Sequence, residues 1–122
     1  MNAHILVVDD HVEMADNISS VLQLAQYRVT TATSGKEGVK QATRLHPDLI
    51  LCDIMMPDLD GAAVFDWITE HRPELVDRLG FCTGGAFTPR SRALVERVAG
   101  RLFDKPLSRS QVLAAVEQLR PK

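Results

Sequence analysis

The sequence contains no long apolar run, few aromatic residues and only two cysteines. A membrane-spanning helix needs about twenty apolar residues in succession, and none is expected here. The N-terminus has no signal-peptide pattern. Cys52 and Cys82 form no CxxC pair, so a thiolate zinc site is excluded. Both lie in apolar runs, where buried, reduced thiols are expected. These absences favour a cytoplasmic protein without a membrane segment.

A surplus of charge is missing as well. The chain has 14 Lys and Arg against 16 Asp and Glu, a formal net charge of -2. Because proteins bind phosphate backbones through a basic face, the scattered basic residues argue against nucleic acid as a direct partner. With 122 residues, 45% hydrophobic and 25% charged, we expect residues 1–122 to form one globular domain.

The sequence does contain a regular alternation of short apolar runs with longer segments of helical periodicity. Strands are expected at 4–10, 27–32, 48–52, 78–83 and 101–103, and helices at 12–26, 34–45, 61–72, 88–98 and from 108 onward. Capping signals support three helix starts, namely Ser34 with Glu37, Thr88 with Pro89, and Ser108 with Gln111. Five strand–helix units in succession predict a parallel sheet covered by helices on both faces.

Polar residues follow four of the expected strands. They are Asp9-Asp10, Asp53, Thr83 with Gly84-Gly85, and Lys105-Pro106. In a doubly wound α/β fold, a site forms beyond the carboxyl ends of the strands, so these residues should converge. Each also has a purely structural interpretation. Asp10 suits a helix cap with Glu13, Asp53 suits a turn, Thr83 an ordinary strand position and Lys105 a solvated loop.

Taken together, the three acids are harder to explain structurally. Like charges about 4 Å apart repel by about 4 kcal/mol at an effective dielectric near 20. A divalent cation would relieve that repulsion, and an all-oxygen site with open positions suits Mg²⁺. With a lysine and a threonine hydroxyl opposite, the set is suited to a phosphoryl group.

These motifs carry a family resemblance. Four motifs follow one another along essentially the whole chain: Asp9-Asp10, Asp53-x-x-Met56-Pro57-x-x-x-Gly61, Thr83 and Lys105-Pro106. The sequence thereby resembles the receiver domain of two-component response regulators. The resemblance implies a flavodoxin-like doubly wound (βα)5 fold, whose five-stranded parallel sheet has the strand order 2-1-3-4-5.

The resemblance also implies a role for each residue. Asp53 would be the nucleophile that takes a phosphoryl group from a histidine kinase or a histidine phosphotransfer domain. Mg²⁺ would be bound by Asp10, Asp53 and the backbone carbonyl of Met55, with Asp9 acting through water. Thr83, Lys105 and Gly84 would bind the phosphoryl group.

The residues that would transmit the phosphorylation signal to a partner depart from the family pattern. Many response regulators have an aromatic residue three positions before the lysine, where this chain has Leu102, followed by Phe103. Either Phe103 takes over part of the role of this aromatic residue in reporting the phosphorylation state, or that state is transmitted through backbone shifts. The expected output surface is formed by the segments 88–98, 101–103 and the last helix, facing a downstream protein or a second copy. The stretch TGGAFTPRSRALVERV is similar to receiver domains of hybrid sensor histidine kinases, and a stand-alone regulator remains equally compatible.

Other functions fit these residues less well. A Mg²⁺-dependent phosphohydrolase would normally need a second acid two positions after Asp53, where the chain has Met55. A nucleotide-binding module would need a glycine-rich first loop. A receiver used only for docking would have lost an acid or the lysine, and this chain keeps all of them. We therefore expect no enzyme activity beyond the domain's own phosphorylation and dephosphorylation.

Cysteine and histidine side chains are expected to stay outside this chemistry. Because Cys52 and Cys82 each precede a site residue, both thiols are expected to point away from the site. The four histidines show no metal-ligand spacing. His11 alone, beside Asp10, is expected to lie at the rim of the site.

Overall fold

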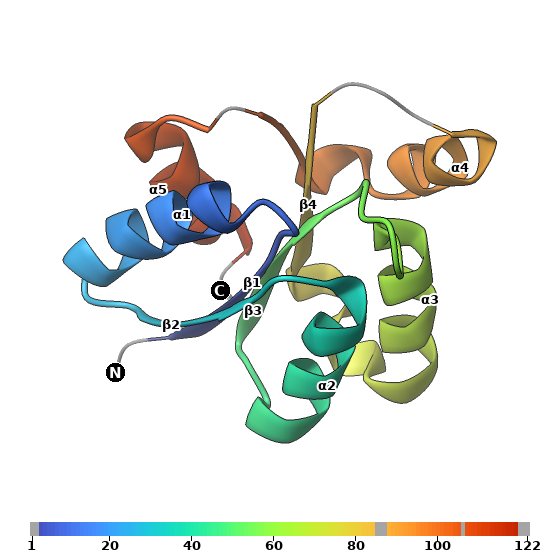
Figure 1. Ribbon diagram of the computed structural model, residues 1–122, viewed down its shortest axis with the longest axis horizontal. Coiled ribbons are helices and arrows are strands. Elements are labelled where there is room, and N and C mark those ends of the chain that lie inside the picture. Colours follow the sequence, from blue (N-terminus) through green and yellow to red (C-terminus); the bar gives the residue numbers. More distant parts are fainter. Residues whose placement is uncertain (1–2, 85–87, 106, 120–122) are drawn as a thin grey trace.

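The computed structural model describes residues 3–84, 88–105 and 107–119, so Gly85 and Pro106 of the expected motifs lie outside the described residues. The strands are β1 (His4–Val8), β2 (Arg28–Ala32), β3 (Leu49–Asp53), β4 (Leu79–Thr83) and β5 (Leu102–Asp104). The helices are α1 (Val12–Leu24), α2 (Gly35–Leu45), α3 (Gly61–His71), α4 (Pro89–Arg97) and α5 (Arg109–Leu119). Strands and helices alternate along the chain as predicted (Figure 1).

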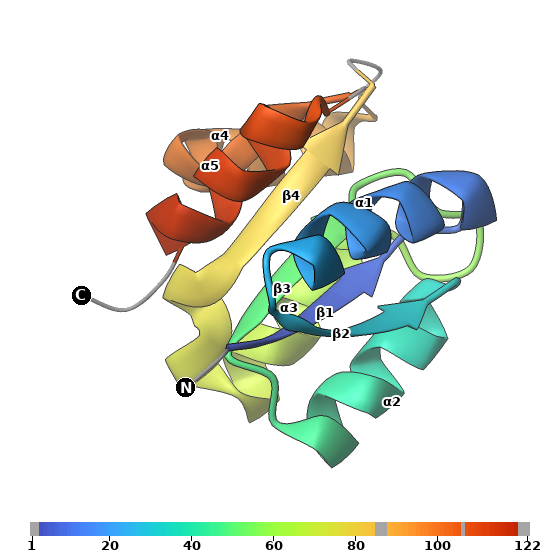
Figure 2. The same ribbon diagram turned by 90° about the vertical axis from the view of Figure 1, so that its left-hand side faces the viewer.

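The strands form one sheet with the order β2-β1-β3-β4-β5, and every neighbouring pair is parallel. The predicted (βα)5 topology is confirmed. Because the strands run the same way, their carboxyl ends share one edge of the sheet (Figure 2). The loops that carry the expected site residues leave from this edge.

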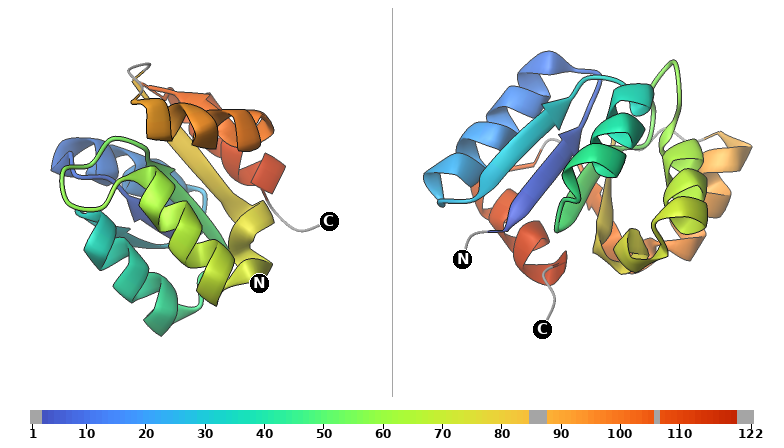
Figure 3. Two further views of the ribbon diagram at one scale, coloured as in Figure 1. Left: turned by 90° about the vertical axis from the view of Figure 1, so that its right-hand side faces the viewer. Right: turned by 90° about the horizontal axis from the view of Figure 1, so that it is seen from below.

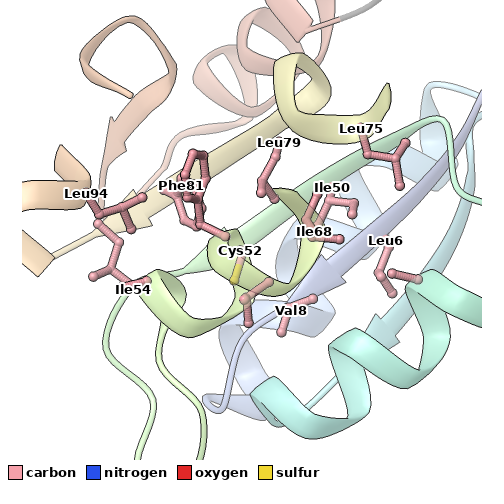
Figure 4. Close-up of a cluster of buried hydrophobic side chains, with 14 of the residues drawn as sticks. Leu6, Val8, Ile50, Cys52, Ile54, Ile68, Leu75, Leu79, Phe81 and Leu94 are labelled. Atoms are coloured by element: carbon pink, nitrogen blue, oxygen red, sulfur yellow. The ribbon is translucent and has the colours of Figure 1, made fainter. Parts of the chain in front are cut away.

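Helices cover both faces of the sheet (Figure 3). α1 and α5 pack on one face through a cluster that includes Ile5, Leu51 and Val116. α2, α3 and α4 pack on the other through a cluster that includes Cys52 and Phe81 (Figure 4). β3 lies in the middle and is buried along its whole length, which explains why its sequence is apolar up to its last residue.

The capping signals are confirmed at the starts of α2, α4 and α5. The Ser34 hydroxyl accepts from the Glu37 N–H at 3.1 Å, and Thr88 forms a reciprocal box with Ser91. At α5, the Gln111 backbone N–H donates to the Ser108 hydroxyl, and the Gln111 side-chain Oε1 accepts from the Ser108 N–H. These bonds satisfy helix N–H groups that have no partner within the helix.

The structure departs from the expected elements in small ways. Two 3₁₀ helices, η1 (Pro73–Arg78) and η2 (Ala99–Arg101), precede β4 and β5 and were not predicted. β5 begins one residue later than expected. Among the described residues, no helix is long and apolar enough to span a membrane.

The loop after β3 is tied to the start of α2. The Asp58 carboxylate accepts the N–H groups of Gly35 and Lys36 at 3.1 and 3.0 Å. The Gly35 backbone also lies so close to Leu59 that a Cβ at position 35 would be 1.9 Å from the Leu59 carbonyl oxygen. Only glycine allows this approach, which fixes where the loop leaves the sheet.

Candidate functional site

Two buried carboxylates and a lysine meet at the carboxyl edge of the sheet. Asp53 is the last residue of β3, and Asp9 follows β1 directly. Their side chains are only 4% and 3% exposed. The ammonium of Lys105, just after β5, lies 3.0 Å from Asp9 Oδ2 and 3.1 Å from Asp53 Oδ2. Lys105 is therefore not a solvated loop charge.

Asp10 and His11 complete this cluster on the other side. The His11 Nδ1 atom lies 3.2 Å from Asp9 Oδ1, 3.3 Å from Asp10 Oδ1 and 3.9 Å from Asp53 Oδ2. Among the described residues, Asp10 Oδ1 is buried without a hydrogen-bond partner. The structural alternative for Asp10 is wrong, because His11 is the N-cap residue of α1 and no side chain caps that helix.

The electrostatics of the cluster are dominated by burial. Burial raises the pKa of Asp53 to about 6; Lys105 acts against that rise, while the charge on Asp9 adds to it. The Met55 N–H also donates to the Asp53 carboxylate, as the turn interpretation expected. Burial acts to lower the pKa of Lys105, but the two carboxylates outweigh it and raise the pKa above its ordinary value. Lys105 is therefore charged at neutral pH.

An open hollow of about 200 Å³ lies over Asp53. Its lining residues are His11, Asp53, Met55, Gly84 and Lys105. A Cβ at Gly84 would meet no atom within 4 Å, so this position leaves the hollow clear. Thr83 comes directly before Gly84, is buried, and accepts the Lys105 N–H through its backbone carbonyl at 2.7 Å.

The two expected switch residues lie on opposite faces of the sheet. Leu102 pairs in register with Phe81, and Phe103 pairs with Cys82. Leu102 packs in the core under α2, α3 and α4, whereas Phe103 packs in the core under α1 and α5. Because strand side chains alternate, Leu102 shares its face with Thr83. The Phe103 ring therefore lies across the sheet from Thr83.

One sequence-based expectation about the cysteines is wrong. Cys82 pairs in register with Asp53, and partners in a parallel ladder project to the same face. Its thiol therefore lies beneath the site. Burial raises its pKa to about 12, the Lys105 charge acts to lower that pKa, and the charges of Asp53 and Asp9 act to raise it. Cys52 does point away, into the opposite core (Figure 4). The expectation rested on alternation along each strand, whereas the register places Cys82 beside Asp53, because β4 runs one residue further than β3.

The donor set fits a divalent cation. The four residues Asp9, Asp10, His11 and Asp53 offer ligand atoms that all lie within 4.8 Å of one another. Three carboxylates face one lysine, so the cluster has excess negative charge, and Asp10 Oδ1 has a free bonding position. Hard cations with oxygen ligands suit such a site.

A family model described as the response regulator receiver domain matches residues 5–117. The chain belongs to this family. Its parallel sheet and its acidic strand ends agree with that membership.

Curated relatives resemble part of the chain. The chain is 44% identical over 72 residues to the alkaline phosphatase synthesis transcriptional regulatory protein PhoP of Bacillus subtilis, covering 59% of this chain and 30% of that protein. It is 38% identical over 80 residues to a protein-glutamate methylesterase/protein-glutamine glutaminase of Archaeoglobus fulgidus, covering 65% and 23%. The matched region thus spans less than a third of these relatives.

Solved structures extend the likeness over nearly the whole chain. A CheY-like receiver domain protein from Methanospirillum hungatei superposes with a TM-score of 0.85 at 26% identity, covering 98% of this chain and 94% of that one. A receiver domain protein from Clostridium thermocellum gives 0.82 at 26% identity, covering 96% and 93%. These neighbours have the flavodoxin-like fold expected from the strand order.

Proposed function

We propose that Asp53 is the phosphoacceptor of this receiver domain. One Asp53 carboxylate oxygen bonds to the phosphorus of a phosphohistidine, the phosphorus–nitrogen bond breaks, and the released imidazole nitrogen takes a proton. The product is a 4-aspartylphosphate. The observation that carries this proposal is the position of Asp53, a buried carboxylate 3.1 Å from the Lys105 ammonium at the floor of an open hollow.

The remaining polar residues of the site are proposed to bind the phosphoryl group. Lys105 is charged and reaches Asp53, so it neutralises phosphoryl oxygens as they approach. The Thr83 hydroxyl and the Gly84 N–H are proposed as hydrogen-bond donors on the β4 side. The absence of a side chain at Gly84 leaves room for the group.

Mg²⁺ is proposed as the cofactor. It supplies positive charge that offsets phosphoryl and carboxylate oxygens during transfer. Asp10, Asp53 and the Met55 carbonyl would hold it directly, with Asp9 acting through water. The fit rests on Asp10 Oδ1, which is buried without a hydrogen-bond partner among the described residues, and on the excess of acids over Lys105.

The donor is proposed to be a cytoplasmic histidine kinase or a histidine phosphotransfer domain. The domain, residues 1–122, would catalyse only its own phosphorylation and dephosphorylation. Its output would be altered contacts of the α4–β5–α5 surface with a protein partner or a second copy. The expectation that nucleic acid is not a direct partner finds no support among relatives named as transcriptional regulators, so the proposal covers this domain alone.

Mass spectrometry of the intact protein tests the proposal. The protein is incubated with Mg²⁺ and a small acyl phosphate, beside Asp53→Asn and a sample with chelator in place of Mg²⁺. We expect one added phosphoryl group in the Mg²⁺ sample and none in either control. Equal addition to Asp53→Asn would overturn the assignment of Asp53.

A further inference from the structure

His11 differs from the other residues of the site because it brings a nitrogen into a group of oxygens. Its Nδ1 atom is the atom that approaches the carboxylates, at 3.2, 3.3 and 3.9 Å from oxygens of Asp9, Asp10 and Asp53. The ring is 68% exposed on its other side. Without a cation, an Nδ1–H group can donate to Asp9 Oδ1. When a cation is bound, Nε2 can carry the hydrogen and donate it to water, and the Nδ1 lone pair is then available to the ion.

The backbone fixes this position of the ring. The His11 N–H donates to Asp9 Oδ1 at 2.9 Å, and its carbonyl accepts the Ala15 N–H at the start of α1. On the far side of the acids, Lys105 binds the second oxygen of Asp9. The carboxylates therefore have an ammonium on one side and an imidazole nitrogen on the other.

The separations match those of ligands around one octahedral ion. Neighbouring ligands with bonds of about 2.1 Å are roughly 3 Å apart, and opposite ligands are roughly 4 Å apart. The distance from Nδ1 to Asp10 is close to the first value, and the distance to Asp53 lies nearer the second. A small ion bound to the Asp10 and Asp53 oxygens can therefore reach the nitrogen with little movement, and Asp9 need not bind it directly.

We propose that His11 is a nitrogen ligand of the divalent cation site and shifts its preference from Mg²⁺ toward first-row transition ions that bind imidazole. This inference rests on the proposed cation site and adds a ligand and a selectivity to it. Carboxylate and carbonyl oxygens suit Mg²⁺, whereas imidazole suits ions such as Ni²⁺, which accepts the same octahedral arrangement.

Calorimetric titration of the untagged protein at pH 8 with Mg²⁺ and, separately, with Ni²⁺ tests the proposal. The variants are His11→Ala, His11→Asn, which keeps a polar side chain, and His71→Ala, which removes an exposed histidine of α3 as the matched control. We expect both His11 variants to weaken Ni²⁺ binding at least about tenfold. Mg²⁺ affinity should change much less, and His71→Ala should behave as the wild type.

A direct spectroscopic readout accompanies the titration. Pulsed electron paramagnetic resonance of bound Mn²⁺ should show coupling to an imidazole ¹⁴N that is lost in both His11 variants and kept in His71→Ala. Unchanged Ni²⁺ affinity and an unchanged nitrogen signal in the His11 variants would overturn the role of His11 alone. If instead Asp10→Asn and Asp53→Asn leave Mg²⁺ and Ni²⁺ affinity unchanged, the cation site itself is wrong.

Discussion

At the scale of single residues, the site is a balance between two buried carboxylates and one lysine. Asp9 and Asp53 are nearly inaccessible, and Lys105 reaches both. Burying charges is costly unless they are paired, so removing one partner leaves an uncompensated charge. The arrangement keeps a carboxylate buried beside the Lys105 ammonium, at a cost to the stability of the cation-free fold.

The first prediction concerns Lys105. Without divalent cation at pH 7.5, Lys105→Ala should lower the free energy of unfolding by about 2–3 kcal/mol, because two buried acids lose their counter-charge. The exposed residue Lys40 of α2 provides the matched control, and Lys40→Ala should change stability by less than about 0.5 kcal/mol. Urea unfolding measures both. Equal stability of the two variants would contradict the account.

The second prediction concerns the pH dependence that Asp53 gives the cation-free protein. Its folded pKa of about 6 lies above the ordinary value of 3.8, so the folded state binds this proton more readily than the unfolded state. The ionised Asp53 carboxylate therefore destabilises the folded state. This destabilisation is full above pH 6 and declines as the pH falls toward 3.8. Asp53→Asn should therefore be more stable than the wild type at pH 7.5 by about 1–2 kcal/mol, allowing for solvent screening at the site mouth.

Urea unfolding of the same two proteins at pH 5 provides the comparison for Asp53. The stability gap should narrow there, because part of the Asp53 population is protonated. A stability gap that stays constant or widens between pH 7.5 and pH 5 would show that ionised Asp53 does not destabilise the fold.

At the scale of elements, the loop between β3 and α3 is positioned by α2. Asp58 binds the first N–H groups of that helix, and Gly35 permits the close approach of Leu59. Burial raises the pKa of Asp58, but hydrogen bonds from backbone N–H groups, those of Lys36, Leu59 and Gly35 among them, together outweigh it and lower the pKa, so the contact persists well below neutral pH. This loop carries Met55, which lines the hollow over Asp53.

The third prediction compares two glycines on this basis. Gly35→Ala should destabilise the fold by at least about 2–3 kcal/mol, because its Cβ would overlap the Leu59 carbonyl and force the loop to move. Gly84→Ala, at a position with open space around a Cβ, should stay within about 0.5 kcal/mol of the wild type. Thermal unfolding followed by circular dichroism distinguishes them. Similar melting temperatures for both variants would contradict the packing described.

How far the sequence could predict these elements depended on the kind of signal. Alternating apolar runs and capping residues such as Ser34 and Thr88 predicted the strands and helix starts, because both signals are local. The register between β3 and β4 is a tertiary property, and the side on which the Cys82 thiol lies was therefore mispredicted. The contact of Asp58 with the start of α2 was missed for the same reason, since the partners are more than 20 residues apart.

At the scale of the whole molecule, the parallel sheet gathers residues that are distant in sequence at one edge. The strand order and the approach of Lys105 to the acids followed from the general rule for doubly wound folds and from the family resemblance. The orientation of His11 did not, because a side chain at a loop rim has no sequence periodicity that would reveal its direction. The fold brings its Nδ1 atom near three carboxylates.

The fourth prediction concerns the stability of the whole fold. A cation that binds only the folded state should add about 2.7 kcal/mol at a hundredfold excess over its dissociation constant. We therefore expect Mg²⁺ to raise the melting temperature by several degrees. Asp10→Asn should lose most of this rise, while Asp66→Asn, an exposed acid on α3, should keep it. A wild-type melting temperature unmoved by Mg²⁺ would contradict the cation site.

The central claim, that Asp53 is the residue that carries the phosphoryl group, is tested most directly by locating the modification. After reaction with the acyl phosphate and Mg²⁺, borohydride reduces an aspartyl phosphate to homoserine, which peptide mass spectrometry can assign to a position. We expect homoserine at position 53 alone. Homoserine at position 9 or 10, or none in protein that has gained a phosphoryl group, would contradict it.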